Sequence, residues 1–159
     1  NQTTRDLTRF FTDYAASQGF DLPDHKVEYI CYAKDQDVLG DAVINWHEAR
    51  IKYGGFQISK QLIRDEMVVL NEAWYADINR AKALAREEGH PDFRDLMNKN
   101  IIPQLPKVEF WQKINTLFQA GTNKWVDSKV YPIFSEREQT LADDLEQAIA
   151  EFDQVRRAA

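Results

Sequence analysis

The chain has 159 residues, of which 43% are hydrophobic and 29% charged, and its formal net charge is −6. This balance is typical of a folded globular domain and excludes an intrinsically disordered chain. The acidic charge argues against a nucleic acid partner, because phosphate backbones are bound mainly by Lys and Arg.

The length and the cysteine content of the chain limit the number of domains and indicate the cellular compartment. The length fits one domain, and we predict a single helical domain over residues 1–159. No apolar run approaches the ~20 residues that span a bilayer, so no transmembrane segment is predicted. Cys31 is the only cysteine, which excludes an intrachain disulfide and favours a reduced compartment. We therefore expect a cytoplasmic protein, although the chain starts at Asn1 rather than at methionine, as a processed or trimmed chain does.

Three helices are predicted in the first half of the chain. Residues 4–18 repeat apolar side chains at helical spacing, and Gly19 is placed to end that helix. Residues 25–53 are predicted to form a long helix that ends at Gly54–Gly55. Residues 59–88 are predicted to form another, with Ser59 as its N-cap and Gly89 at its end. Two long helices joined by a short turn are expected to pair antiparallel.

From His90 to Pro132 the predicted helices are short and interrupted. They cover residues 93–99, 108–120 and 125–131, with prolines and Gly121 between them. Six of the nineteen aromatic residues fall within residues 110–134. Aromatic side chains beside chain breaks can line a ligand pocket or anchor a partner, and they can also simply fill a core. The candidates for ligand or partner contact are Trp111, Phe118, Trp125 and Tyr131.

The last predicted helix starts with a capping box at residues 135–138. A narrow apolar seam follows at helical spacing, and it is expected either to dock on the rest of the domain or to pair with a partner helix. The main seam residues are Leu141, Leu145, Ile149 and Phe152. Because no segment is convincing as a strand, the predicted fold is all-α: a bundle of about four long helices with a short, irregular, aromatic-rich helical insertion before the last one.

The sequence does not contain the residue spacings that known catalytic, metal-binding and cofactor-binding motifs require. A calcium loop counted from Asp35 lacks oxygen ligands at its fifth and twelfth positions. The Glu-x-x-His spacing of a dimetal bundle occurs once, at residues 87–90, beside Gly89 and Pro91. One cysteine and three histidines in different segments, His25, His47 and His90, do not form a zinc motif. We therefore predict no catalytic residue, no metal and no cofactor.

Three functional hypotheses remain from the sequence. The leading one is a non-enzymatic helical interaction or accessory module that binds a protein partner or associates with itself through its C-terminal helix. The alternative is a sensor or carrier that binds a small molecule in an apolar pocket between helices. The third is an enzyme with a carboxylate-based site, which would use Glu28, Glu66 or Glu72 if they face inward.

Overall fold

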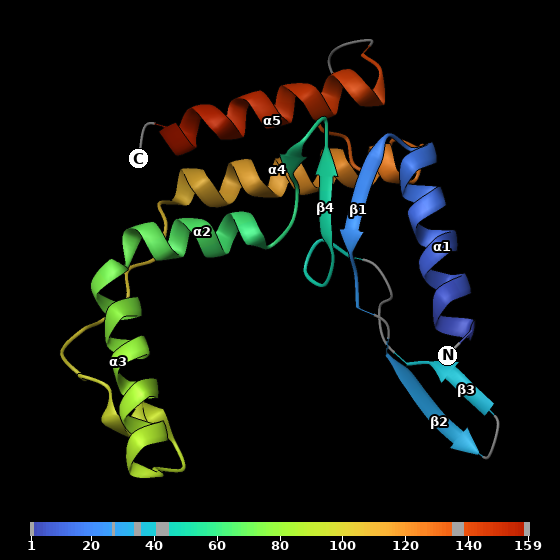
Figure 1. Cartoon of the computed structure of the whole chain (residues 1–159). Coiled ribbons are helices and arrows are strands. Elements are labelled where there is room, and N and C mark those ends of the chain that lie inside the picture. Colours follow the sequence, from blue (N-terminus) through green and yellow to red (C-terminus); the bar gives the residue numbers. More distant parts are fainter. Residues whose placement is uncertain (1, 27, 34–35, 41–44, 135–138, 158–159) are drawn as a thin grey trace. The chain divides into compact units, whose positions relative to one another are not determined.

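A computed structural model describes residues 2–26, 28–33, 36–40, 45–134 and 139–157 (Figure 1). In these ranges the chain forms five α-helices, one short 3-10 helix and five short β-strands. The fold is therefore mixed α/β, and the prediction of an all-α bundle of four long helices is wrong. The chain gathers into two compact units, which we call unit 1 (residues 1–62 and 108–159) and unit 2 (residues 63–107). That residues 1–159 form a single domain stays a prediction, but the prediction that this domain is purely helical is wrong.

Two antiparallel helices supply much of the core of unit 1. They are α4 (Val108–Trp125) and α5 (Leu141–Arg157), which lie side by side (Figure 1). Lys113 Nζ on α4 donates to Glu151 Oε2 on α5 at 2.8 Å, and this lowers the pKa of Glu151. Between the helices, apolar side chains that include Leu117 are removed from water, which is the main driving force for the pairing.

The strands of unit 1 form two separate antiparallel pairings. The three-stranded sheet has the order β1 (Phe20–Asp24), β4 (Arg50–Tyr53), β5 (Phe56–Gln57). The second pairing joins β2 (Tyr29–Ala33) to β3 (Gln36–Leu39). In the three-stranded sheet, side chains alternate between buried and exposed along β1 and β4, as expected for strands with one face on a core.

The predicted helix over residues 25–53 is wrong because its C-terminal end belongs to a hairpin. Gly54 and Gly55 have φ values of 53° and 79°, and they connect Tyr53 to its antiparallel partner Phe56. A two-residue hairpin turn of this type needs positive φ at both central positions, which glycine adopts without a Cβ clash. The glycine pair therefore reverses a strand instead of ending a helix.

Two of the other predicted helices have close counterparts in the structure. Helix α1 (Gln2–Ser17) confirms the first prediction, and Gly19 follows it with a φ of 82°. The predicted helix over residues 59–88 is split at Asn71 into α2 (Gln61–Leu70) and α3 (Glu72–Glu88). Gly89 ends α3 in the left-handed conformation, as predicted.

The boundaries of the last two helices differ from the prediction. Helix α4 runs through Gly121 without a break and ends at Trp125. The capping box predicted at residues 135–138 lies outside the described residues. A second box caps α5 instead: the N–H of Asp143 donates to Thr140 Oγ1, and the N–H of Thr140 donates to Asp143 Oδ2.

Unit 2 consists of α2, α3, the 3-10 helix η1 (Phe93–Leu96) and an extended segment, residues 97–107, which we call the strap. Two buried polar side chains hold the strap. Asn71 donates from Nδ2 to the carbonyl of Gln104 at 3.0 Å and accepts the N–H of the same residue on Oδ1. Asp77 Oδ2 accepts the N–H of Asn98 at 2.7 Å, while its Oδ1 accepts from Arg80.

Acid should release one of these two attachments and not the other. The N–H of Asn98 and the guanidinium of Arg80 hold the pKa of Asp77 below its usual value of 3.8. A carboxylate with a lowered folded pKa contributes stability at higher pH, and this contribution is lost as the pH falls through the folded pKa. We expect the Asn98 amide to stay protected from hydrogen exchange at pH 3.8 and to lose protection below it, as measured by NMR.

The control amide is that of Gln104, which is held by the non-titrating side chain of Asn71. It should keep its protection over the same pH range. If both amides lost their protection from exchange together, or if the Asn98 amide lost it well above pH 3.8, a local attachment through Asp77 would be contradicted.

Candidate functional site

Unit 1 contains a pocket between its sheet and α4, with a cavity of about 230 Å³. Among the described residues, five side chains line it: Asn45, Trp46, Ile51, Thr122 and Trp125. Ile51 lies on β4, whereas Thr122 and Trp125 come from the last turn of α4. The two indoles give the pocket aromatic walls, and none of the described lining residues carries a charge.

The Trp46 indole is held on α4 by three neighbours. Its ring stacks on Phe118 with a centroid distance of 6.1 Å and an interplanar angle of 10°. Its Nε1 donates to Thr122 Oγ1 at 2.9 Å. A Cβ added to Gly121 would come within 3.1 Å of the indole carbons Cη2 and Cζ2, so the ring occupies the space where a side chain would stand. Glycine at position 121 therefore permits the close approach of ring and helix.

The Trp125 indole forms the second wall and is fixed from the other side. Tyr14 on α1 donates from its hydroxyl to the carbonyl of Trp125 at 2.9 Å, and its ring packs edge-on against the indole. Phe20 on β1 lies 5.4 Å from the same indole between ring centroids. The two indoles meet at 6.2 Å and 78°, a T-shaped arrangement that aromatic pairs favour. Both walls are thus fixed by the folded unit.

Asn45 supports the pocket by organising the turn that carries Trp46. Its Oδ1 accepts the N–H groups of His47 and Glu48 at 2.7 and 2.9 Å. The carbonyl of Trp46 accepts the N–H of Lys60 at 2.7 Å, which ties the turn to the segment before α2. These hydrogen bonds satisfy backbone groups that have no partner in a sheet or helix.

Of the four aromatic residues predicted to contact a ligand or partner, two lie at this pocket. Trp125 lines it and Phe118 supports Trp46. Trp111 lies near the other end of α4, packed edge-on against Phe110 and partly exposed. Tyr131 follows α4, where its backbone N–H and carbonyl both bond to the buried side chain of Asn123 at 2.8 Å. The structure therefore does not bring all four residues together.

The C-terminal seam lies against α4 inside unit 1. Leu145 and Phe152 are fully buried, and Phe152 packs on Phe110 with a centroid distance of 5.4 Å. Leu141 and Ile149 are half-buried. With its central side chains already covered, the seam offers little apolar surface to a partner.

Sequence reasoning missed Trp46, Asn45, Ile51 and Thr122 as pocket residues. The first three fall in the segment that was predicted to be helical, so no pocket could be placed there. Local signals for the correct structure were present. Residues 50–57 alternate polar and apolar side chains around two glycines, the pattern of a short hairpin.

Unit 2 carries a second surface of interest on its exposed side. Val69 on α2 exposes 76% of its surface, and Ile102 and Leu105 on the strap expose 80% and 78%. Val68, next to Val69, is also exposed. Leu105 directly follows Gln104, the residue that Asn71 holds. These four apolar residues, which we call the apolar face of unit 2, lie on segments fixed by buried hydrogen bonds.

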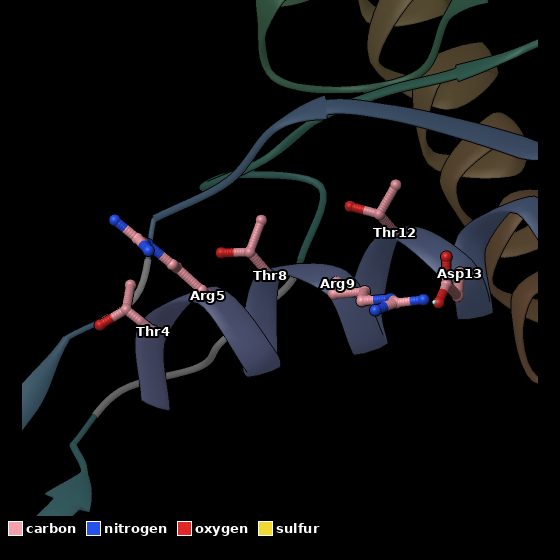
Figure 2. A pocket seen from close by; sticks show the side chains of 6 residues that line it. All are labelled: Thr4, Arg5, Thr8, Arg9, Thr12 and Asp13. Atoms are coloured by element: carbon pink, nitrogen blue, oxygen red, sulfur yellow. Dashed lines mark ion pairs between the residues drawn. The ribbon is translucent and has the colours of Figure 1, made fainter. Parts of the chain in front are cut away.

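A larger hollow of about 340 Å³ lies along α1, but it is formed from one side of a single helix (Figure 2). Its lining side chains are Thr4, Arg5, Thr8, Arg9, Thr12 and Asp13. Figure 2 shows the threonines on the same side of the helix and Arg9 extended towards Asp13, at 3.7 Å between Nε and Oδ2. Both ends of this ion pair are largely exposed, so it adds little stability, and the hollow is an open furrow.

The three glutamates considered for a carboxylate site differ in their burial. Glu66 is buried in unit 2, whereas Glu72 and Glu28 are exposed. No group of three His, Cys, Asp or Glu side chains among the described residues is arranged to hold a metal ion. None of the described helices combines the length and apolar composition that crossing a bilayer requires.

The close contact at Gly121 predicts the effect of a single methyl group. In an exposed helix, Gly→Ala stabilises by about 1 kcal/mol, but overpacking a filled site costs about 1–3 kcal/mol. Because Trp46 is held by Thr122 and Phe118, it has little room to yield. We therefore expect Gly121→Ala to lower the free energy of unfolding by about 1 kcal/mol in urea titrations and to shift the tryptophan emission.

Gln112→Ala, at an exposed position of the same helix, is the control and should change stability by less than about 0.5 kcal/mol. A Gly121→Ala variant that is more stable than the parent chain would show that the indole moves freely and is not held by the helix.

Comparison with known proteins provides no relative from which a role could be transferred. No protein-family model matches the chain, and neither a curated protein nor a solved structure is significantly similar to it. The positions and contacts of its own side chains are therefore the basis for assigning a role.

Proposed function

We propose that the chain is a protein-interaction module that uses the apolar face of unit 2 to associate with a second copy of itself. The observation that carries this proposal is the distribution of side chains in unit 2. Large apolar residues such as Val69 and Leu105 point to solvent, while the buried positions are occupied largely by polar or small residues. Large exposed apolar side chains on a fixed framework are typical of contact surfaces.

The small interior of unit 2 supports this proposal. Its buried side chains among the described residues are those of Glu66, Asn71, Asp77, Ala81, Ala85 and Pro106. A unit of roughly 45 residues buries too little apolar surface to be very stable by itself. Covering Val69, Ile102 and Leu105 in a contact would add the burial that the interior lacks, at roughly 25 cal/mol for each Å² of apolar surface.

The charge distribution also favours contact between two copies. Residues 63–107 contain eight acidic and seven basic side chains, a net charge of −1, whereas the whole chain carries −6. Two copies that meet through unit 2 therefore bring together nearly neutral surfaces, which repel each other little. In a twofold contact each copy contributes the same surface, so the face needs to be complementary only to itself.

Substitution of the two strap residues tests the proposal. We expect the parent chain to change from monomer to dimer with rising concentration in analytical ultracentrifugation. The double variant Ile102→Ser/Leu105→Ser should raise the dissociation constant at least about tenfold, equivalent to roughly 1.4 kcal/mol. Both side chains are exposed, so the variant should keep the fold of the parent chain.

Val130→Ser is the matched control, because Val130 is an exposed apolar residue of unit 1 outside the proposed face. It should leave the dissociation constant unchanged. A parent chain that stays monomeric up to about 1 mM, a very weak association, would refute self-association. So would a control variant that weakens association as much as the double variant does.

A further inference from the structure

We propose that the pocket lined by Trp46 and Trp125 binds a small, neutral aromatic molecule that carries a hydrogen-bond acceptor. This is a second role, located in unit 1 and independent of the association through unit 2. Four features support it: the volume of the pocket, the rigidity of its walls, the neutral side chains of its described lining residues and the hydrogen-bonding groups that they offer.

The space is a half-open pocket that can hold more than water alone. A cavity of about 230 Å³ compares with a liquid volume of about 30 Å³ for each water. It lies somewhat below the range of about 300–1,000 Å³ that is typical of drug-sized ligands. The pocket therefore fits a molecule of one or two rings.

The walls are fixed before a ligand arrives. Trp46 is held by Gly121, Thr122 and Phe118, and Trp125 by Tyr14 and Phe20. A preformed space with rigid aromatic walls spares a ligand the entropic cost of ordering its site. Flat rings gain stacked or edge-on contacts with indoles, which favours an aromatic ligand over a saturated one.

The described lining residues favour an uncharged ligand. Asn45, Trp46, Ile51, Thr122 and Trp125 are all neutral. The nearby side chains of Glu48 and Lys60 neutralise each other in an ion pair of 3.5 Å. A charged ligand would lose its hydration without gaining an opposite charge, so a neutral molecule is favoured.

The hydrogen-bonding capacity of the lining favours an acceptor on the ligand. Asn45 Oδ1 already accepts two backbone N–H groups, so the carboxamide has its nitrogen hydrogens left to donate. Thr122 Oγ1 accepts from Trp46 and donates its own hydrogen to the carbonyl of Phe118. The indole N–H of Trp125 is likewise a donor only. A carbonyl or ring nitrogen on the ligand complements these groups better than a hydroxyl hydrogen does.

Three probes of similar size separate these requirements: benzamide, benzoate and cyclohexanecarboxamide. Binding is followed by tryptophan fluorescence in a Trp74→Phe/Trp111→Phe background, which leaves the two pocket indoles as reporters, and by calorimetry. We expect benzamide to bind with a dissociation constant below about 1 mM. Benzoate, which adds a charge, and cyclohexanecarboxamide, which lacks the aromatic ring, should each bind at least about tenfold more weakly.

Variants of the wall locate the binding site. Trp125→Ala should abolish benzamide binding, whereas Trp125→Phe keeps an aromatic face and should retain it within about tenfold. Circular dichroism checks that each variant is folded. If Trp125→Ala does not fold, the comparison of the three probes and the Trp125→Phe variant still decide the matter. Absence of benzamide binding up to about 10 mM, equal affinity for all three probes, or unchanged binding by a folded Trp125→Ala chain would each overturn the proposal.

Discussion

Two buried asparagine side chains hold the irregular parts of this chain where a helix or sheet partner is missing. Asn71 binds both the N–H and the carbonyl of Gln104, and Asn123 does the same for Tyr131. Buried backbone groups must find partners, and the prolines in these segments prevent a regular helix. A carboxamide is suited to this role because it offers one acceptor and one donor side by side, which pair with the two groups of a single peptide residue.

Both candidate functional surfaces lie next to one of these contacts. Leu105, on the apolar face of unit 2, follows Gln104 directly. Thr122, in the wall of the aromatic pocket, precedes Asn123 on α4. An extended segment without such a contact would sample many conformations, and the entropic cost of ordering it would fall on every binding event. Asn71 orders the strap during folding, so that Leu105 is positioned in the free protein.

The sequence predicts those helices that place apolar side chains on one face over three or more turns. That pattern located α1, most of α3 and α4, and the seam of α5. It failed over residues 25–53, where apolar residues at apparent helical spacing belong to short strands. There the decisive signal was local, since the alternation around Gly54–Gly55 specifies a hairpin that a long apolar pattern does not reveal.

The pocket illustrates why a site can be only half predicted from sequence. The aromatic density after residue 110 pointed to Phe118 and Trp125, but Trp46 lies more than seventy residues earlier and came with a wrong secondary structure. Gly121 was equally ambiguous. Inside a helix glycine costs about 1 kcal/mol relative to alanine, which favours interpreting it as a break. Only its spatial neighbour explains its presence, because the contact of the Trp46 indole with bare backbone offsets the propensity lost. Glycine has no side chain that a sequence pattern could reveal. The role of Gly121 in making room for the Trp46 indole therefore becomes apparent only from the structure.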